Sequence, residues 1–362
     1  MAIQDHNLKL TEQQYRDLEI PSYSMLSSID KQGLDVVGGV KQSFNLKFGN
    51  LVDVMCFEPD RVDEIFHKGI SPKPPTTNVK NICDLILGQL DGKEGEIAPN
   101  VTPFRRKEKK ISSKLSDYSD EILAAAIRLK VYKGYTDPKT IETVVSTGSE
   151  YFKDKIKSRG KVLIKPDMWD HATITANTLL SHPFTAKYFA KGVPGIEIIY
   201  QYKFDTKVAG MRCKGMLDCV VINHNQKLIF PIDLKTGEQP CKDFPMLYTL
   251  LKYYIQGGLY REALKTIVDN DFDLMGYDVK PFEFVYISKL NPMKPMRFLV
   301  TEEMHTASLN GFVDRYGYAH TGVIDLLDSY YYSVQNNNAE YTQKEIDSKG
   351  LIELKFNEIT GK

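Results

Sequence analysis

Two aspartates and a lysine stand in a pattern that suits metal-assisted chemistry on a phosphate. Asp218 ends the segment GMLD, Asp233 lies fifteen positions later within PIDLKT, and Lys235 follows Asp233 by two positions. Alternate residues of a strand point to one face, so Asp233 and Lys235 should project together. Carboxylates bind Mg²⁺, which can supply a hydroxide nucleophile, and an ammonium beside it can offset charge on the transition state. The pattern therefore favours phosphodiester hydrolysis.

An ordinary surface ion pair is the competing interpretation, because such pairs are common on strands and contribute little to stability. The residues just before Asp233, 229–232 (IFPI), are mainly apolar. A carboxylate at the end of a buried strand is costly unless it binds something. This context favours a functional site over a surface pair. Glu197, on the strand predicted before Asp218, could supply a third carboxylate near the same cluster.

The elements that must position these residues are predicted by a change of hydrophobic period near residue 195. Alternating and β-branched segments predict three consecutive strands of a meander, with turn-like stretches between them. In chain order, the predicted elements are strands 195–204, 211–222 and 227–234, a long helix 245–268, strands 281–288 and 296–301, and a helical stretch 302–335.

The N-terminal half is predicted to be mainly helical, with helices at 46–57, 119–133, 137–157 and from 167 to 181. Helices followed by strands and helices in this order indicate an α/β or α+β fold, with a mixed central sheet flanked by helices. We therefore expect a helical region over 1–165 that wraps the core, a core over 166–335, and a C-terminal tail over 336–362.

Composition narrows the class of protein. The 362 residues carry 47 basic and 47 acidic side chains, so the net charge of zero counts mildly against nucleic-acid binding without excluding it. There is no apolar run long enough for a membrane span and no apolar segment near the N-terminus like that of a secretory signal. Five cysteines without a CxxC pair give little support to zinc or disulfide frameworks, and we expect reduced thiols in a cytoplasmic protein.

Three motifs in order resemble those of the RecB-like branch of the PD-(D/E)XK nucleases. Residues 215–218 (GMLD), 231–236 (PIDLKT) and 256–260 (QGGLY) are similar to its G-x-x-D, D-x-K-T and Q-x-x-x-Y motifs. Upstream, residues 23–29 (YSMLSSI) and 48–59 (FGNLVDVMCFEP) resemble the exonuclease VIII (RecE-like) family within that branch. The resemblance covers about residues 20–65 and 165–300, and it implies a core like that of restriction endonucleases.

The resemblance also implies roles for individual residues. Asp218, Asp233 and the main-chain carbonyl of Leu234 would bind Mg²⁺, with Mn²⁺ able to substitute, and Lys235 would be the catalytic lysine. The remaining catalytic positions would be Glu197, Gln256 and Tyr260, of which the last two would contact DNA or orient the site. A helix that simply packs on the sheet is the alternative for those two.

Asp53 stands where the family usually has histidine. Aspartate binds a hard metal as well as histidine does, so it is either a further metal ligand or a plain polar residue on an apolar helix. The four-cysteine iron–sulfur site of another branch is not expected, because no cysteine follows Cys241.

The basic run within 105–114 offers DNA-binding side chains, since lysine and arginine contact phosphates without recognising sequence. A solvated loop is the alternative. The residues expected to contact DNA are Arg105, Arg106, Lys109 and Lys110.

The function that the resemblance implies is a 5′→3′ exonuclease on linear double-stranded DNA, of the phage recombination or replication kind. It would form a homo-oligomer, work with a single-strand annealing protein, and act in the cytoplasm, which is the host's for a phage protein. Two rivals share the core: an endonuclease or repair nuclease, and a catalytically weak subunit that binds DNA ends.

Overall fold

The computed structural model describes residues 3–32, 44–69, 75–90, 111–190, 192–336 and 347–351. The chain divides into two compact units. Unit 1 joins Met1–Phe57 to Thr173–Lys362, and unit 2 is Glu58–Ala172. The expected division near residue 165 thus has a counterpart near 172, but the first 57 residues belong with the core and do not form part of a separate helical region.

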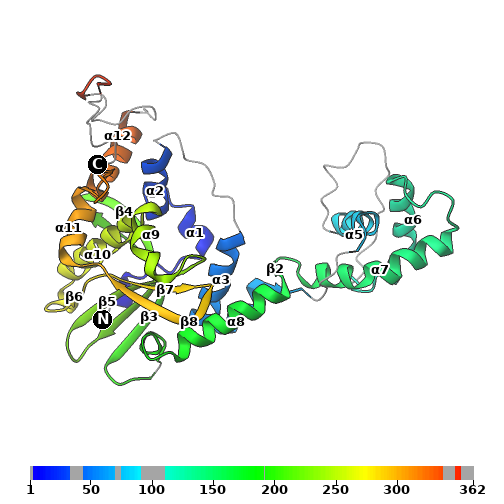
Figure 1. Cartoon of the computed structure of the whole chain (residues 1–362), viewed down its shortest axis with the longest axis horizontal. Helices are drawn as coiled ribbons and strands as arrows, with labels where there is room; N and C mark the ends of the chain where they lie inside the picture. Colours follow the sequence, from blue (N-terminus) through cyan, green and yellow to red (C-terminus); the bar gives the residue numbers. More distant parts are fainter. Residues whose placement is uncertain are drawn as a thin grey trace. The chain divides into compact units, whose positions relative to one another are not determined.

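The sheet of unit 1 carries the residues of interest. Its strands are β3 (Ile196–Val208), β4 (Met211–Asn223), β5 (Leu228–Gly237), β6 (Asp278–Val279), β7 (Glu283–Ser288) and β8 (Asn291–Leu299). The order across the sheet is β3-β4-β5-β7-β8, with β6 paired to β5. β3, β4 and β5 are antiparallel neighbours, as the predicted meander requires, and β5 runs parallel to β7. The mixed sheet flanked by helices, seen in Figure 1, confirms the α/β class.

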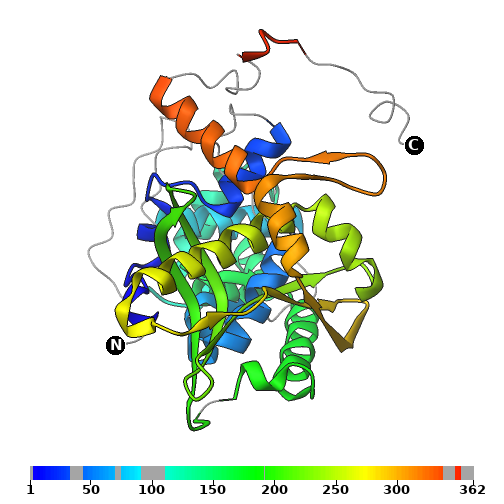
Figure 2. The same ribbon diagram turned by 90° about the vertical axis from the view of Figure 1, so that its left-hand side faces the viewer.

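Helices from both ends of the chain pack around this sheet (Figures 1 and 2). They are α1 (Glu12–Arg16), α2 (Tyr23–Gln32), α3 (Phe44–Phe57), α9 (Phe244–Leu250), α10 (Tyr253–Asn270), α11 (Glu302–Asn310) and α12 (Val323–Asn336). α10 is largely buried, and Figure 2 shows it, in yellow-green, lying across the green strands of the meander. α3 contacts β5. Both helices therefore approach the strand that carries Asp233 and Lys235.

The long helix predicted over 245–268 is broken into α9 and α10. Lys252 lies at the break in the left-handed region, with φ of 62°, which no helix interior tolerates. Its ammonium group lies 2.6 Å from the Asp30 carboxylate of α2. A long-range ion pair is thus found at the break, and the local sequence contains no glycine or proline that would have predicted it.

The helical stretch predicted over 302–335 is also interrupted. A short hairpin of β9 (Phe312–Val313) and β10 (Ala319–His320) separates α11 from α12. Gly311, with φ of 86°, ends α11, and a Cβ on Gly322 would lie 2.4 Å from the Leu309 carbonyl. The tight backbone approach at these two glycines explains why the helix does not continue.

Unit 2 consists of α4 (Val62–Ile65), β1 (Phe66–Lys68), α5 (Thr77–Leu90), α6 (Ser119–Arg128), α7 (Asp137–Lys157), β2 (Val162–Ile164) and the start of α8 (Pro166–Ser181), which continues into unit 1. α5, α6 and α7 share a hydrophobic core of their own. The helix predicted over 137–157 has those bounds in α7. Within the described part of the chain, no helix has the length and apolar character that crossing a bilayer requires.

Candidate active site

The strands β4 and β5 part at the two predicted aspartates. Their ladder runs from Asn223 and Leu228 to Cys219 and Ile232, so the next residues along the two strands are Asp218 and Asp233. The main-chain N–H of Leu234 donates to Asp218 Oδ2 at 2.8 Å. The Asp218 carboxylate thus accepts the hydrogen bond that a main-chain carbonyl of β4 would accept if the ladder continued. Asp218 and Asp233 consequently lie opposite each other on adjacent strands where the ladder ends, close enough for their charges to interact.

Asp233 is held on both of its oxygens. Its side chain is 2% exposed, Oδ1 accepts a hydrogen bond from Gln256 Nε2 at 2.6 Å, and Oδ2 lies 2.7 Å from Lys235 Nζ. The Lys235 ammonium also lies 4.9 Å from the centre of the Tyr253 ring. Asp233 and Lys235 thus project together, as the alternation of a strand requires. One helix, α10, supplies both Gln256 and Tyr253.

Asp53 of α3 belongs to the same electrostatic cluster. Burial and then repulsion from Asp233 raise the pKa of Asp53 to about 7, although Lys235 pulls it down. Burial and the charges of Asp233 and Asp53 also raise the pKa of Asp218 well above its ordinary value. Three carboxyl groups therefore share the neighbourhood of one ammonium, which leaves an excess of negative charge when all are ionised.

The same charges stabilise the protonated form of Lys235. Burial would lower the pKa of Lys235, but attraction to Asp233, Tyr253 and Asp218 outweighs it, so the pKa is raised well above that of an ordinary lysine. Lys235 is therefore a fixed positive charge at neutral pH. A group in this state stabilises negative charge and orients a nucleophile but does not act as a general base.

Gln256 and Tyr260, the two residues that define the Q-x-x-x-Y segment, lie in different surroundings. Gln256 is buried, and its Nε2 donates a hydrogen bond to Asp233. Its Oε1 atom is also buried and has no hydrogen-bond partner among the described residues. Tyr260 is buried one turn later, edge-on to the rings of Phe204 and Tyr23 at 5.5 and 6.5 Å. Gln256 is thus placed to orient the carboxylate, and Tyr260 is placed in the core.

Glycine at position 215 is required by that packing. A Cβ on Gly215 would lie 2.2 Å from the Phe204 ring and 2.7 Å from the Tyr260 ring. Gly215, the first residue of GMLD, therefore packs directly against Tyr260, the last residue of QGGLY. This contact fixes α10 against β4, three residues before Asp218.

Glu197 lies away from the cluster, which corrects the expectation of a third carboxylate there. It pairs with Ile222 in the β3–β4 register, four residues along β4 from Asp218, or roughly 13 Å at the rise of a strand. Its carboxylate contacts His224 Nε2 at 2.9 Å, and His224 Nδ1 meets the Tyr277 hydroxyl at 2.9 Å. The register of the hairpin thus carries Glu197 toward the opposite end of the strand.

The four residues predicted to contact DNA, Arg105, Arg106, Lys109 and Lys110, lie outside the described residues. Two tyrosines near the cluster were not predicted as site residues. Tyr253 lies one helical turn before Gln256 and contacts Lys235, and the pKa of Tyr23 is raised by burial and influenced by Lys235 and Asp233. The spacing of three residues between Tyr253 and Gln256 was the signal that could have identified the first of them.

The donor set fits a small, hard cation such as Mg²⁺. Within the described part of the chain, no group of three or more histidine, cysteine or acidic side chains is arranged to hold a metal ion. Mg²⁺ does not need such a group, since it commonly takes one or two carboxylates and completes its shell with water and substrate phosphate. The carboxylates of Asp218 and Asp233, on adjacent strands, meet that smaller requirement, and the surplus negative charge favours a cation.

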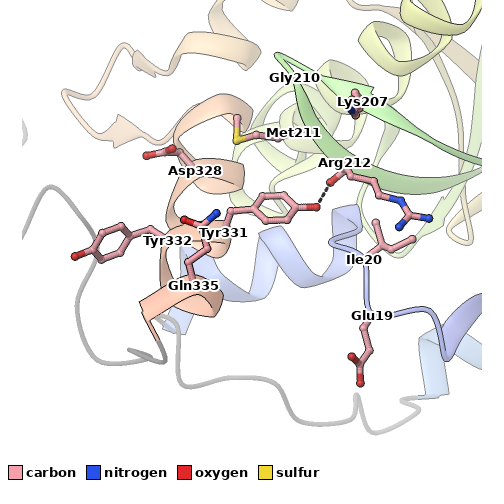
Figure 3. A pocket seen from close by; sticks show the side chains of 10 residues that line it. All are labelled: Glu19, Ile20, Lys207, Gly210, Met211, Arg212, Asp328, Tyr331, Tyr332 and Gln335. Carbon is pink, nitrogen blue, oxygen red and sulfur yellow. Dashed lines mark hydrogen bonds between the residues drawn. The ribbon is translucent and has the colours of Figure 1, made fainter.

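A cavity of about 540 Å³ lies away from these residues (Figure 3). It is bounded by the β3–β4 turn at Gly210, by α12 and by the segment before α2, and the Tyr331 hydroxyl donates to the Arg212 carbonyl at 2.7 Å. Arg212 precedes Asp218 by six residues on β4, roughly 20 Å of strand. The cavity is therefore separate from the carboxylates.

No family model matches the chain, and no curated protein matches it. Among solved structures, a protein from Eubacterium rectale named as a candidate exonuclease has 12% identity and a TM-score of 0.33, with 89% of this chain and 99% of that chain covered. The protein SSO0001 has 12% identity and a TM-score of 0.21, with 64% and 82% covered. At such TM-scores the backbones agree too little for either likeness to bear on function.

Proposed function

We propose that this chain is a metal-dependent nuclease that hydrolyses phosphodiester bonds of DNA. One observation carries the proposal: Asp218 and Asp233 lie opposite each other on adjacent strands where β4 and β5 part, and Lys235 Nζ lies 2.7 Å from Asp233 Oδ2. Two oxygen ligands and a fixed ammonium at one point are what hydrolysis of a phosphodiester requires.

The aspartates and Lys235 have different proposed roles, which are metal binding and stabilisation of negative charge on the phosphate. Asp218 and Asp233 would hold Mg²⁺, together with the main-chain carbonyl of Leu234 that the family resemblance implies. Bound there, the cation supplies Lewis acidity and a water of lowered pKa. Lys235 orients the attacking water or offsets charge on the phosphate oxygens. Gln256 fixes the direction of the Asp233 carboxylate.

The more specific proposal is an exonuclease that degrades linear double-stranded DNA from 5′ to 3′ with Mg²⁺. The upstream segments 23–29 and 48–59 support it, since they resemble the exonuclease VIII family within the RecB-like branch to which the three motifs are similar. A homo-oligomer and a single-strand annealing partner belong to the same proposal. An endonuclease with this core, or a weakly active subunit that binds DNA ends, would use the same residues.

Digestion of end-labelled DNA tests the proposal. Linear duplexes labelled at the 5′ or 3′ end, and a nicked circle, are incubated with the full chain in Mg²⁺ or in EDTA. We expect linear DNA to be degraded only with Mg²⁺, with immediate release of the 5′ label. Rapid cutting of the circle would instead indicate an endonuclease.

Matched variants separate the site from the rest of the chain. Asp218→Asn and Asp233→Asn should each abolish degradation, whereas Asp269→Asn should leave it intact, because Asp269 is an exposed aspartate on α10. If either site variant degraded DNA at the wild-type rate, the assigned centre would be wrong. If DNA ends were bound but never cleaved by the wild-type chain, the end-binding role would replace catalysis.

A further inference from the structure

A second cavity, of about 510 Å³, opens beside the sheet strand β8 and is here named the β8 pocket. It lies where the β7–β8 turn meets the segment after β5. The described residues that line it are Pro240, Cys241, Lys242, Ser288, Leu290, Asn291, Lys294, Met296 and Phe298. They include two lysines and no acidic side chain. The pocket is thus an apolar recess with positive charge around it.

The pocket shares the catalytic face of the sheet. Lys235 of β5 is in register with Tyr286 of β7, and Tyr286 is in register with Met296 of β8. Residues in register point to the same face, so Met296 projects on the side of Lys235. The distance is two strand spacings, or about 10 Å. A strand of nucleic acid bound at the carboxylates could therefore place a neighbouring nucleotide at the pocket.

One wall of the pocket is a supported aromatic ring. Phe298 is stacked on Phe244 with the ring centres 4.4 Å apart, and Phe244 packs in turn on Phe284 and Tyr286 at 5.6 and 5.1 Å. Phe298 itself remains partly exposed toward the pocket. A ring fixed from behind and open in front is a stacking surface for another flat ring.

The rest of the lining suits the same occupant. Cys241 Sγ lies 3.4 Å from the Lys294 carbonyl, a contact that holds the segment after β5 against β8. Lys242 and Lys294 are exposed beside the recess, where a phosphate would follow a buried base. A volume of this size falls within the range of small-ligand pockets. Stacking combined with cations is how proteins bind single-stranded nucleic acid without base readout.

We propose that the β8 pocket binds one nucleobase of the DNA strand held at the carboxylates, stacked on Phe298, with Lys242 and Lys294 on the adjoining phosphates. The inference rests on the proposed nuclease function and deepens it. It assigns to the chain a subsite that grips the substrate beside the scissile bond. The base is held by its flat face, so the subsite accepts all four bases.

A fluorescent base analogue tests the pocket directly. The Asp218→Asn chain is mixed, in Ca²⁺, with a set of duplexes that each carry 2-aminopurine at one position near the end. We expect the fluorescence at one position to be strongly quenched on binding, because stacking on Phe298 quenches it. Phe298→Leu keeps an apolar contact with Phe244 but removes the ring, so it should abolish that quenching and weaken binding about tenfold. Leu299→Ala, an exposed neighbour on the other face, is the control.

Two variants at Leu290 provide a second test of the β8 pocket, which does not depend on the folding of Phe298→Leu. Leu290 lines the pocket and is 72% exposed, so neither substitution should disturb the fold. Leu290→Glu should weaken DNA binding and remove the position-specific quenching, whereas Leu290→Lys should preserve both, because the neighbouring phosphate is negative. Equal behaviour of the two variants would overturn the proposal.

The outcomes distinguish the pocket from the nuclease itself. If the wild-type chain degrades DNA in Mg²⁺ but no position is quenched, or the pocket variants match Leu299→Ala, the subsite is refuted and the nuclease function stands. If the wild-type chain neither binds nor degrades DNA, both proposals fall together.

Discussion

Gln256 donates a hydrogen bond of 2.6 Å to Asp233, which joins helix α10 to strand β5 across 23 residues of sequence. The contact is buried, and Asp233 is held on its other oxygen by Lys235. The carboxylate is therefore oriented from two directions before any substrate binds. Under the proposed function Asp233 binds Mg²⁺, and a partner that orients such a carboxylate commonly controls both metal affinity and rate.

Gln256→Ala should reduce Mg²⁺ affinity and cleavage rate by about 10–100-fold, since Asp233 would lose the donor that orients it. Gln256→Glu should be worse, because it adds a negative charge against Asp233. Both effects are measured as the Mg²⁺ dependence of single-turnover cleavage. Asn270→Ala, on the exposed end of the same helix, is the control. A wild-type Mg²⁺ curve for Gln256→Ala would show that this hydrogen bond has no part in the chemistry.

Lys235→Ala should lower kcat by about 10²–10³ and leave DNA affinity in Ca²⁺ nearly unchanged, because ground-state binding comes from many phosphate contacts. Lys235→Arg should not restore the rate, since the planar guanidinium cannot occupy the position of a point charge beside Tyr253. Single-turnover cleavage and equilibrium binding are measured side by side. Normal cleavage with weak binding would assign Lys235 to the DNA backbone instead.

Without metal, the chain should become less stable as pH rises from about 4 to 7. The pKa of Asp53 is raised from 3.8 to about 7 in the folded chain, so the folded state binds this proton more tightly than the unfolded state does. Stability is then lost as pH increases between those two values. Thermal unfolding in EDTA at several pH values measures the effect. Asp53→Asn should flatten the decline, and Asp269→Asn should follow the wild type; identical slopes for both variants would contradict the assignment.

Gly215→Ala should destabilise unit 1 by about 1–3 kcal/mol, because its Cβ would overlap the rings of Phe204 and Tyr260. Gly88→Ala is the matched control: it lies in helix α5 with nothing within 4 Å of the added Cβ, so it should be neutral or stabilise by up to about 1 kcal/mol. Chemical denaturation of both variants measures the difference. If Gly215→Ala were as stable as Gly88→Ala, Tyr260 would have to pack elsewhere.

Local patterns in the sequence were enough to identify the meander and to place Asp233 and Lys235 on one face of it. Period-two alternation around residues 195–234 predicted β3, β4 and β5, and the same alternation put Asp233 and Lys235 on one face. The helix over 137–157 was equally clear. These features depend on neighbours within a few residues, so the sequence by itself determines them.

Long-range contacts decided the rest. The hairpin register moved Glu197 roughly four residues away from Asp218, toward His224, and periodicity alone carries no information on register. The break at Lys252 coincides with its ion pair to Asp30, more than two hundred residues earlier in the chain.

The electrostatic cluster is likewise a property of the tertiary structure. A motif resemblance pointed to Asp53, but only the packing of α3 against β5 brings its carboxyl under the influence of Asp233 and Lys235. The β8 pocket has no sequence signature, because its lining comes from two segments that lie more than forty residues apart in the chain, 240–242 and 288–298. Sequence thus determined which side chains are chemically suited to the proposed reaction. The three-dimensional packing decided which of them meet, since charge interactions and burial depend on distance in space.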